Sequence, residues 1–117
     1  MADLLSLARD KKAARIAQLN DALRRSFTGG QLMLTAGIAA LPDDLKAQVL
    51  QTVREFSHFD GSNDPYGEHD FGAFELESLT VVWKIDYYNA DMTVGSEDSA
   101  DPQMTMRVLT IMRADEY

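Results

Sequence analysis

The chain of 117 residues contains no cysteine. This absence excludes a disulfide framework, a zinc site built from thiolates, a redox motif and a cysteine nucleophile. Long hydrophobic runs are also missing. None approaches the ~20 apolar residues of a membrane span. The amino terminus has too few consecutive apolar residues before Arg9 and Asp10 for a signal peptide. We therefore expect a cytoplasmic protein with no membrane contact and no bound cofactor.

Phosphate-binding and nucleophile motifs are absent as well. Gly29-Gly30 is not followed by the Lys and Ser/Thr of a phosphate-binding loop, and no GxGxxG pattern occurs. Ser62 lies in no nucleophile elbow. These absences favour a binding protein over an enzyme.

Basic residues are scarce in the second half of the chain. Residues 55–101 contain twelve acids and a single base, Lys84, and the whole chain has a net charge of −8. Nucleic-acid-binding proteins concentrate Lys and Arg on the contacting face, so we expect no direct nucleic-acid binding. The acidity suits a partner with a basic surface, or a cation. The alternative interpretation is that the acidic surface only keeps the protein soluble.

The bases that the chain does have cluster near its start. They are Arg9, Lys11, Lys12, Arg15, Arg24 and Arg25. On a helix they scatter around the circumference, so we interpret them as a solvated face that meets the acidic half of the same molecule or of a second copy.

The apolar pattern predicts one α+β domain over residues 1–117, with an antiparallel sheet of about four strands and two helices packed on one face. A helix is expected over 10–27, and residues 1–9 form a frayed or additional helical turn. The apolar stripe of this helix comprises Ile16, Leu19, Leu23 and Phe27. The sequence leaves open whether the protein is a monomer or a homodimer.

The other expected elements follow in chain order. They are a strand at 31–35, a buried connection at 36–41, a helix from Pro42 to near Ser57, and strands at 73–77, 79–89 and 104–113. The last strand is apolar on both faces in its centre, so we place it inside the sheet. Alternation puts Trp83 on the buried face of its strand, with Tyr87, while Tyr66 and Tyr88 are expected at the surface.

The loop 58–70 is the strongest candidate site. It contains His58, Asp60 and His69, which are possible ligands for a metal ion. The spacing matches neither an EF-hand nor a helical zinc motif. Turn chemistry alone accounts for most of these residue types, so a structural loop in which His69 and Asp70 hold the segment against the sheet is the competing interpretation.

Four segments carry a resemblance to a known family. They are Asn63–Gly72 (NDPYGEHDFG), Trp83–Tyr88 (WKIDYY), Leu34–Ile38 (LTAGI) and Arg107–Met112 (RVLTIM). From about Arg15 onward the chain resembles a small bacterial family, domain of unknown function 3768. The resemblance implies a gene context on plasmids and integrated elements, and it implies no activity.

From the residues we expect a non-enzymatic acidic binding or inhibitor protein, and the resemblance implies that it belongs to a mobile genetic element. As an anti-defence protein (anti-CRISPR or antirestriction), it would occupy the basic nucleic-acid-binding surface of a host protein by mimicking DNA. The alternatives are a small metal-assisted enzyme using the loop 58–70 and a housekeeping interaction module. The predicted partner-binding residues are Asp64, Tyr66, Glu68, Asp70, Asp86, Tyr88, Glu97, Asp98 and Asp101.

Overall fold

The chain opens with one long helix. In the computed structural model, which describes residues 3–117, this helix is α1 (Leu4–Ser26). The carboxylate of Asp3 caps its first turn by accepting a hydrogen bond from Ser6 N at 2.7 Å. It ends at Phe27, whose left-handed φ of 56° lets its N–H bond to Leu23 O. Residues 4–9, expected to be a frayed or additional helical turn, form the first turns of α1, and residues 1 and 2 lie outside the described part.

Strands and shorter helices follow. They are β1 (Gln31–Leu34), α2 (Ala36–Ala39), α3 (Asp43–Glu55), β2 (Phe71–Leu76), β3 (Leu79–Tyr88), β4 (Met106–Arg113) and the 3-10 helix η1 (Ala114–Glu116). Pro42 precedes α3, and two aspartates occupy its first turn, as the helix dipole favours. The segment expected to be a plain buried connection contains the helix α2 and buries Ile38 completely.

The four strands form one mixed sheet in the order β1-β4-β3-β2. The pairs β2–β3 and β3–β4 are antiparallel, but β1 runs parallel to β4, with Gln31 opposite Val108. The prediction of an antiparallel sheet is wrong at this pair. The physical reason is the long connection: two helices and two strands separate β1 from β4, so no hairpin constrains their relative direction. The interior position predicted for the last strand is confirmed.

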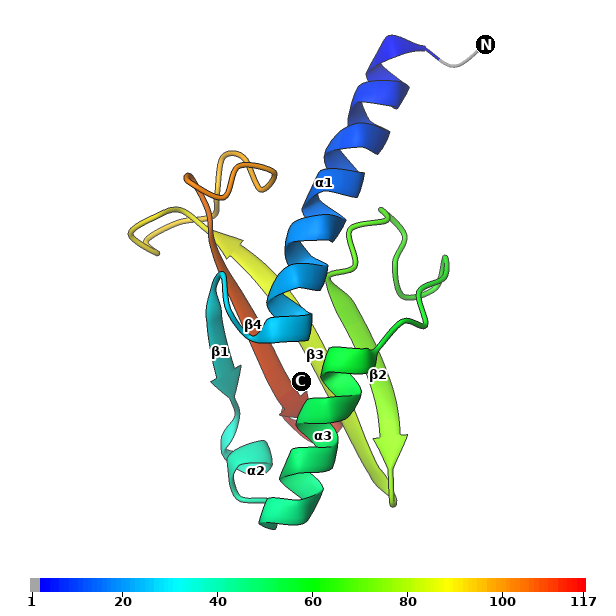
Figure 1. Ribbon diagram of the computed structural model, residues 1–117, viewed down its shortest axis with the longest axis vertical. Coiled ribbons are helices and arrows are strands. Elements are labelled where there is room, and N and C mark those ends of the chain that lie inside the picture. The colour runs from blue at the N-terminus through cyan, green and yellow to red at the C-terminus, as the bar shows by residue number, and fades with distance from the viewer. Residues whose placement is uncertain (1–2) are drawn as a thin grey trace.

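Helices α1 and α3 lie on the same face of the sheet (Figure 1). Between them and the strands lies a cluster of buried side chains: Leu23, Ile38, Val49, Val53, Val81, Trp83, Ile85, Leu109 and Ile111. Trp83 is completely buried, which confirms its predicted phase. Gly72 in β2 makes room for the tryptophan, because a Cβ at this position would collide with the indole.

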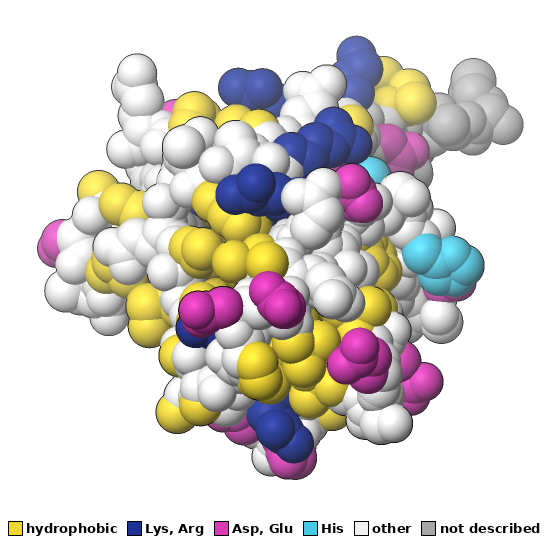
Figure 2. Space-filling model, turned by 60° about the horizontal axis from the view of Figure 1, so that its bottom comes forward, with side chains coloured by type: hydrophobic (Ala, Val, Ile, Leu, Met, Phe, Trp, Pro, Cys, Tyr) yellow, Lys and Arg dark blue, Asp and Glu magenta, His cyan; other side chains and the backbone are white. Residues whose placement is uncertain are grey.

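On one face of the molecule, basic and acidic side chains are unevenly distributed. In the view of Figure 2, most Lys and Arg side chains gather in the upper part and most Asp and Glu side chains lie below them. No helix within residues 3–117 is long and apolar enough to span a membrane.

Candidate functional site

Two acidic loops lie at the end of the molecule from which α1 extends (Figure 1). The first acidic loop, residues 58–70, connects α3 to β2, and the second acidic loop, residues 89–105, connects β3 to β4. Both loops are attached to α1 by side chains that are partly or fully buried. The two attachments differ, and they determine which carboxylates remain available at the surface.

His69 attaches the first acidic loop to α1. Its Nδ1 lies 3.0 Å from Asp21 Oδ1, and its Nε2 lies 3.6 Å from Asp64 Oδ2. The ring stacks on Phe59 at 4.0 Å with an interplanar angle of 3°. His69 has a φ of 56°, and the Asp64 carboxylate accepts a hydrogen bond from its backbone N–H. The imidazole, which is 30% exposed, thus contacts two carboxylates and an aromatic ring, an arrangement that suits a structural anchor.

Asp21 links this anchor to a buried guanidinium. Arg24 is 1% exposed and donates to Asp21 Oδ1 at 2.9 Å. It also donates to the carbonyls of Val53 and Arg54 at the last turn of α3. The Val53 carbonyl accepts a second hydrogen bond, from Phe56 N at 3.3 Å. Burial lowers the pKa of Arg24, while its hydrogen bond to Asp21 opposes that shift. Arg24 therefore joins α1, α3 and the first acidic loop.

Asn20 is the centre of a second network, which holds both loops. Its Nδ2 donates to Glu68 O at 3.0 Å and to Tyr87 Oη at 2.8 Å. Its Oδ1 accepts a hydrogen bond from Arg107 Nε at 2.9 Å. Arg107 in turn donates to the carbonyl of Ser99 in the second acidic loop. One completely buried amide thus connects the two loops through α1 and the sheet.

Tyr87 completes this network as a donor. Its hydroxyl donates to Glu68 Oε1 at 3.0 Å. Burial, assisted by the negative charges of Glu68 and Asp70, raises the pKa of the Tyr87 hydroxyl. The phenol accordingly stays protonated at neutral pH and keeps Glu68 in place.

The structure divides the predicted residues of the first acidic loop into two groups. Asp64 and Glu68 serve the internal networks, and the Asp64 side chain is only 7% exposed. Asp70 is half-buried, and desolvation followed by the nearby charge of Glu68 raises its pKa. Tyr66 alone is freely presented, 79% exposed, beside a groove between this loop and α1.

The candidate metal ligands do not converge. His58 is 86% exposed, and its one ion pair among the described residues is with Asp60, at 3.4 Å. His69 is occupied by Asp21 and Asp64. Within residues 3–117 no group of three or more His, Asp or Glu side chains is arranged to hold a metal ion. The geometry therefore gives no support to the metal-assisted alternative.

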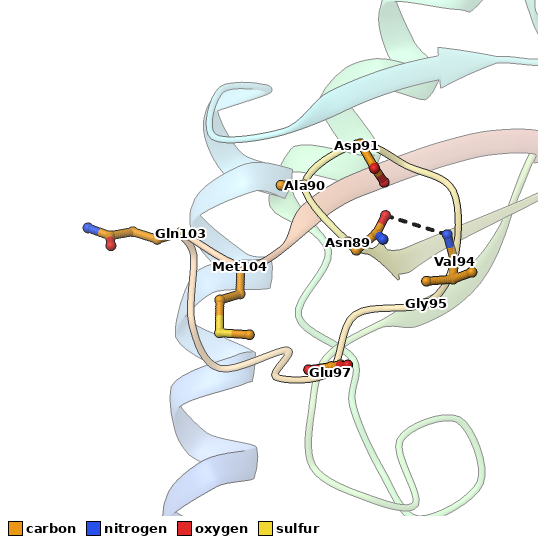
Figure 3. Close-up of a pocket in the computed structure, with 8 residues that line it drawn as sticks. All are labelled: Asn89, Ala90, Asp91, Val94, Gly95, Glu97, Gln103 and Met104. Carbon is orange, nitrogen blue, oxygen red and sulfur yellow. Dashed lines mark hydrogen bonds between the residues drawn. The ribbon is translucent and has the colours of Figure 1, made fainter.

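The second acidic loop encloses a hollow of about 400 Å³, which we call the loop hollow. It is lined by Asn89, Ala90, Asp91, Val94, Gly95, Glu97, Gln103 and Met104 (Figure 3). Val94 is 62% exposed and Met104 is 43% exposed, so its lining offers apolar surface to solvent. In Figure 3 the Gln103 side chain points away from the hollow, whereas Met104 points toward Glu97.

Short-range hydrogen bonds hold the loop hollow in shape. Asn89 Oδ1 accepts from Thr93 N and from Val94 N, and Asp91 accepts from Thr93. The bonds from Thr93, first its hydroxyl and then its N–H, lower the pKa of Asp91, so this carboxylate is ionised at neutral pH. Glu97 is exposed and forms no ion pair among the described residues.

The remaining predicted residues have mixed positions. Asp98 contacts Lys12 of α1 at 3.7 Å and caps a turn at Ala100, and Asp101 caps a turn at Gln103. Asp86 and Tyr88 lie on the face of the sheet opposite the helices, where Asp86 pairs with Lys84 at 2.8 Å. The structure therefore does not bring the nine predicted residues together into one patch.

Sequence reasoning missed the residues that organise this end: Asn20, Asp21, Arg24 and Arg107. A signal existed for two of them. Asn20 and Arg24 follow Ile16 at intervals of four, so a helix places all three on one face. The buried face of α1 comprises Ile16, Ala17, Asn20, Leu23 and Arg24, and it is displaced from the predicted stripe. Polar residues at helical spacing beside apolar ones indicate a buried network.

Comparison with known proteins gives one result. The family model described as "Protein of unknown function (DUF3768)" matches residues 34–116, which include both acidic loops and the whole sheet beyond β1. Neither the curated proteins nor the solved structures include a match to this chain. Since the matched segment covers well over half of the sequence, the chain belongs to the DUF3768 family.

Proposed function

We propose that this protein is a non-enzymatic binding protein whose second acidic loop engages a basic surface on another protein. The observation that carries the proposal is the loop hollow, in which exposed apolar side chains lie beside carboxylates that have no cationic partner within residues 3–117. Val94 and Met104 supply the apolar part, and Asp91 and Glu97 supply the charge.

Charge complementarity supports a basic partner. Among the described residues, neither Asp91 nor Glu97 nor Asp101 forms an ion pair with a Lys or Arg side chain. The single base of residues 55–101, Lys84, is already paired with Asp86. Carboxylates without internal partners attract a cationic surface, and this attraction mainly accelerates encounter.

The apolar part of the loop hollow supports a protein as the partner. Protein interfaces combine an apolar centre with a polar rim, and methionine is enriched in them. Arg and Lys side chains fit such a hollow because their aliphatic stems pack on apolar atoms while their charged ends reach the rim.

The specific role that we propose is inhibition. A row of carboxylates can compete with nucleic-acid phosphates for a basic groove, since duplex DNA carries one charge per ~1.7 Å of axis. A protein of a mobile genetic element that blocks a host CRISPR or restriction nuclease in the cytoplasm would act in this way. A housekeeping interaction module is the alternative, and the experiment below separates the two.

The test begins with capture of partners from cells that express the protein natively. The recovered partner is then mixed with the purified protein and increasing amounts of duplex DNA. We expect DNA and the protein to exclude each other from the partner. A partner that binds both at once would contradict inhibition by occupation of a nucleic-acid surface. Failure to recover any partner with a basic surface would contradict the broader proposal.

A further inference from the structure

The first turns of α1 carry apolar side chains that the rest of the described chain leaves largely exposed. Leu4 is 83% exposed, Leu5 is 74% exposed and Leu7 is 45% exposed. Figure 1 shows this part of α1 extending beyond the loops and the sheet. Helices in proteins derive most of their stability from packing of an apolar face, and neighbouring exposed apolar side chains mark an interaction site. We therefore expect the tip of α1 to contact another molecule.

The side of α1 that faces away from the sheet is apolar in its first turns and basic in the turns that follow. Leu4, Leu7, Lys11 and Arg15 follow one another at intervals of three or four residues, which places them along one side of the helix. Lys11 and Arg15 are exposed, and neither forms an ion pair among the described residues. The complementary surface must therefore offer apolar groups beside carboxylates.

The loop hollow has this composition. Val94 and Met104 are apolar and exposed, and Asp91 and Glu97 are acidic. Contact between α1 and the second acidic loop already exists within one molecule, where Lys12 Nζ lies 3.7 Å from Asp98 Oδ1. The helix tip and the loop hollow lie at the same end of the molecule (Figure 1), so a second molecule can reach both.

We propose that the occupant is a second copy of this chain. The tip of α1 from one molecule docks in the loop hollow of its partner, and a two-fold axis makes the reciprocal contact at the same time. The inference rests on the proposed function only in treating the loop hollow as a binding surface. Pairing of the two α1 helices with each other is disfavoured, because it would bring Lys11 and Arg15 against their own copies.

Self-association and partner binding then compete for the same hollow. The dimer protects the hollow until a partner with a stronger basic surface displaces the helix. A variant that cannot dimerise through its helix should consequently bind the partner more tightly than the wild type.

The test is sedimentation velocity on the purified chain and on charge-swapped variants. The helix variant carries Lys11→Glu and Arg15→Glu, and the hollow variant carries Asp91→Asn and Glu97→Lys. We expect the wild type to form a dimer in the micromolar range and each variant to dissociate at least about tenfold more readily. In a mixture of the two variants every helix meets a hollow of opposite charge, so the heterodimer should form.

Two further variants separate this contact from a general effect of charge. Leu4→Gln with Leu7→Gln should weaken the dimer without altering charge, and Glu75→Lys with Glu77→Lys, at the β2–β3 turn, should leave it intact. A wild type that stays monomeric at high concentration would overturn the inference, and so would a mixture that fails to form heterodimers. Partner binding by the helix variant, whose hollow is intact, would then still uphold the proposed function.

Discussion

The two acidic loops contain four acids each but use their carboxylates differently. In the first acidic loop, Asp64 and Glu68 contact His69 and Tyr87 and stabilise the fold. In the second, Asp91 and Glu97 stand beside an apolar hollow with no cationic partner among the described residues. The count of acids in a segment therefore does not identify a binding surface. The internal partners of each carboxylate decide whether it is available.

Trp83 lies in the core that carries both loops, so its removal should have the largest effect on stability. The indole is completely buried and contacts Phe56 and Phe59 edge-on, at 5.5 and 6.1 Å between ring centroids. Trp83→Ala should lower the free energy of unfolding by about 3–5 kcal/mol, measured by urea denaturation. An unchanged free energy of unfolding would contradict the packing of the helices on the sheet.

Asn20 joins the two regions, and its removal should loosen both. Asn20→Ala leaves the Arg107 guanidinium and the Tyr87 hydroxyl without a shared partner, which should cost about 2–3 kcal/mol. Amide hydrogen exchange should become faster in both acidic loops. Asn20→Asp keeps the acceptor for Arg107 and should protect the second loop better than the first. Faster exchange in only one loop of the alanine variant would show that the network is not shared.

His69 belongs to the first acidic loop alone. His69→Ala removes the stack on Phe59 and the contact with Asp21, and it should cost about 1–2 kcal/mol. Hydrogen exchange should accelerate in residues 58–70 and stay unchanged in the second loop. The exposed His58 provides the control, since His58→Ala should change neither. If both substitutions changed stability and hydrogen exchange equally, His69 would not differ from the surface residue His58 as an anchor of the loop.

Substitution of Asp70 should have the smallest effect on stability, and this effect should be a gain at neutral pH. Its pKa is raised above 3.8 by desolvation and by Glu68, so its ionised form destabilises the folded state at neutral pH. Asp70→Asn should therefore stabilise the protein at pH 7, and the gain should vanish as the pH falls and Asp70 takes up its proton. Asp60→Asn is the control and should not stabilise the protein at pH 7, because hydrogen bonds from Ser62 lower the pKa of Asp60 and favour its ionised form. A gain that grows on acidification would contradict this assignment.

Much of the fold could be predicted because local periodicity reflects burial. The alternation around Trp83 identified the buried face of β3, and the apolar centre of β4 identified its interior position. The direction of β1 relative to β4 could not be predicted, because residues far apart in sequence form that pair. The site was harder still. The roles of Asp64 and Glu68 depend on His69 and Tyr87, but also on Asn20 and Asp21 of a distant helix, which no local pattern reveals.

The central claim is that binding resides in the second acidic loop and not in acidity as such. Two variants with equal changes in charge separate these possibilities. The loop variant carries Asp91→Asn, Glu97→Gln and Asp101→Asn, in which the asparagines retain acceptors for the turns at Thr93 and Gln103. The turn variant carries Glu75→Gln, Glu77→Gln and Asp115→Asn, near the β2–β3 turn and the carboxyl end of β4.

The decisive measurement is the association rate of each variant with the recovered partner across a salt series. Attraction between exposed charges is screened over ~8 Å at physiological ionic strength. We predict that the loop variant associates more slowly than the wild type and depends less on salt, while the turn variant behaves like the wild type. Equal rates for the two variants across the series would contradict the claim and would assign the negative charge to solubility alone.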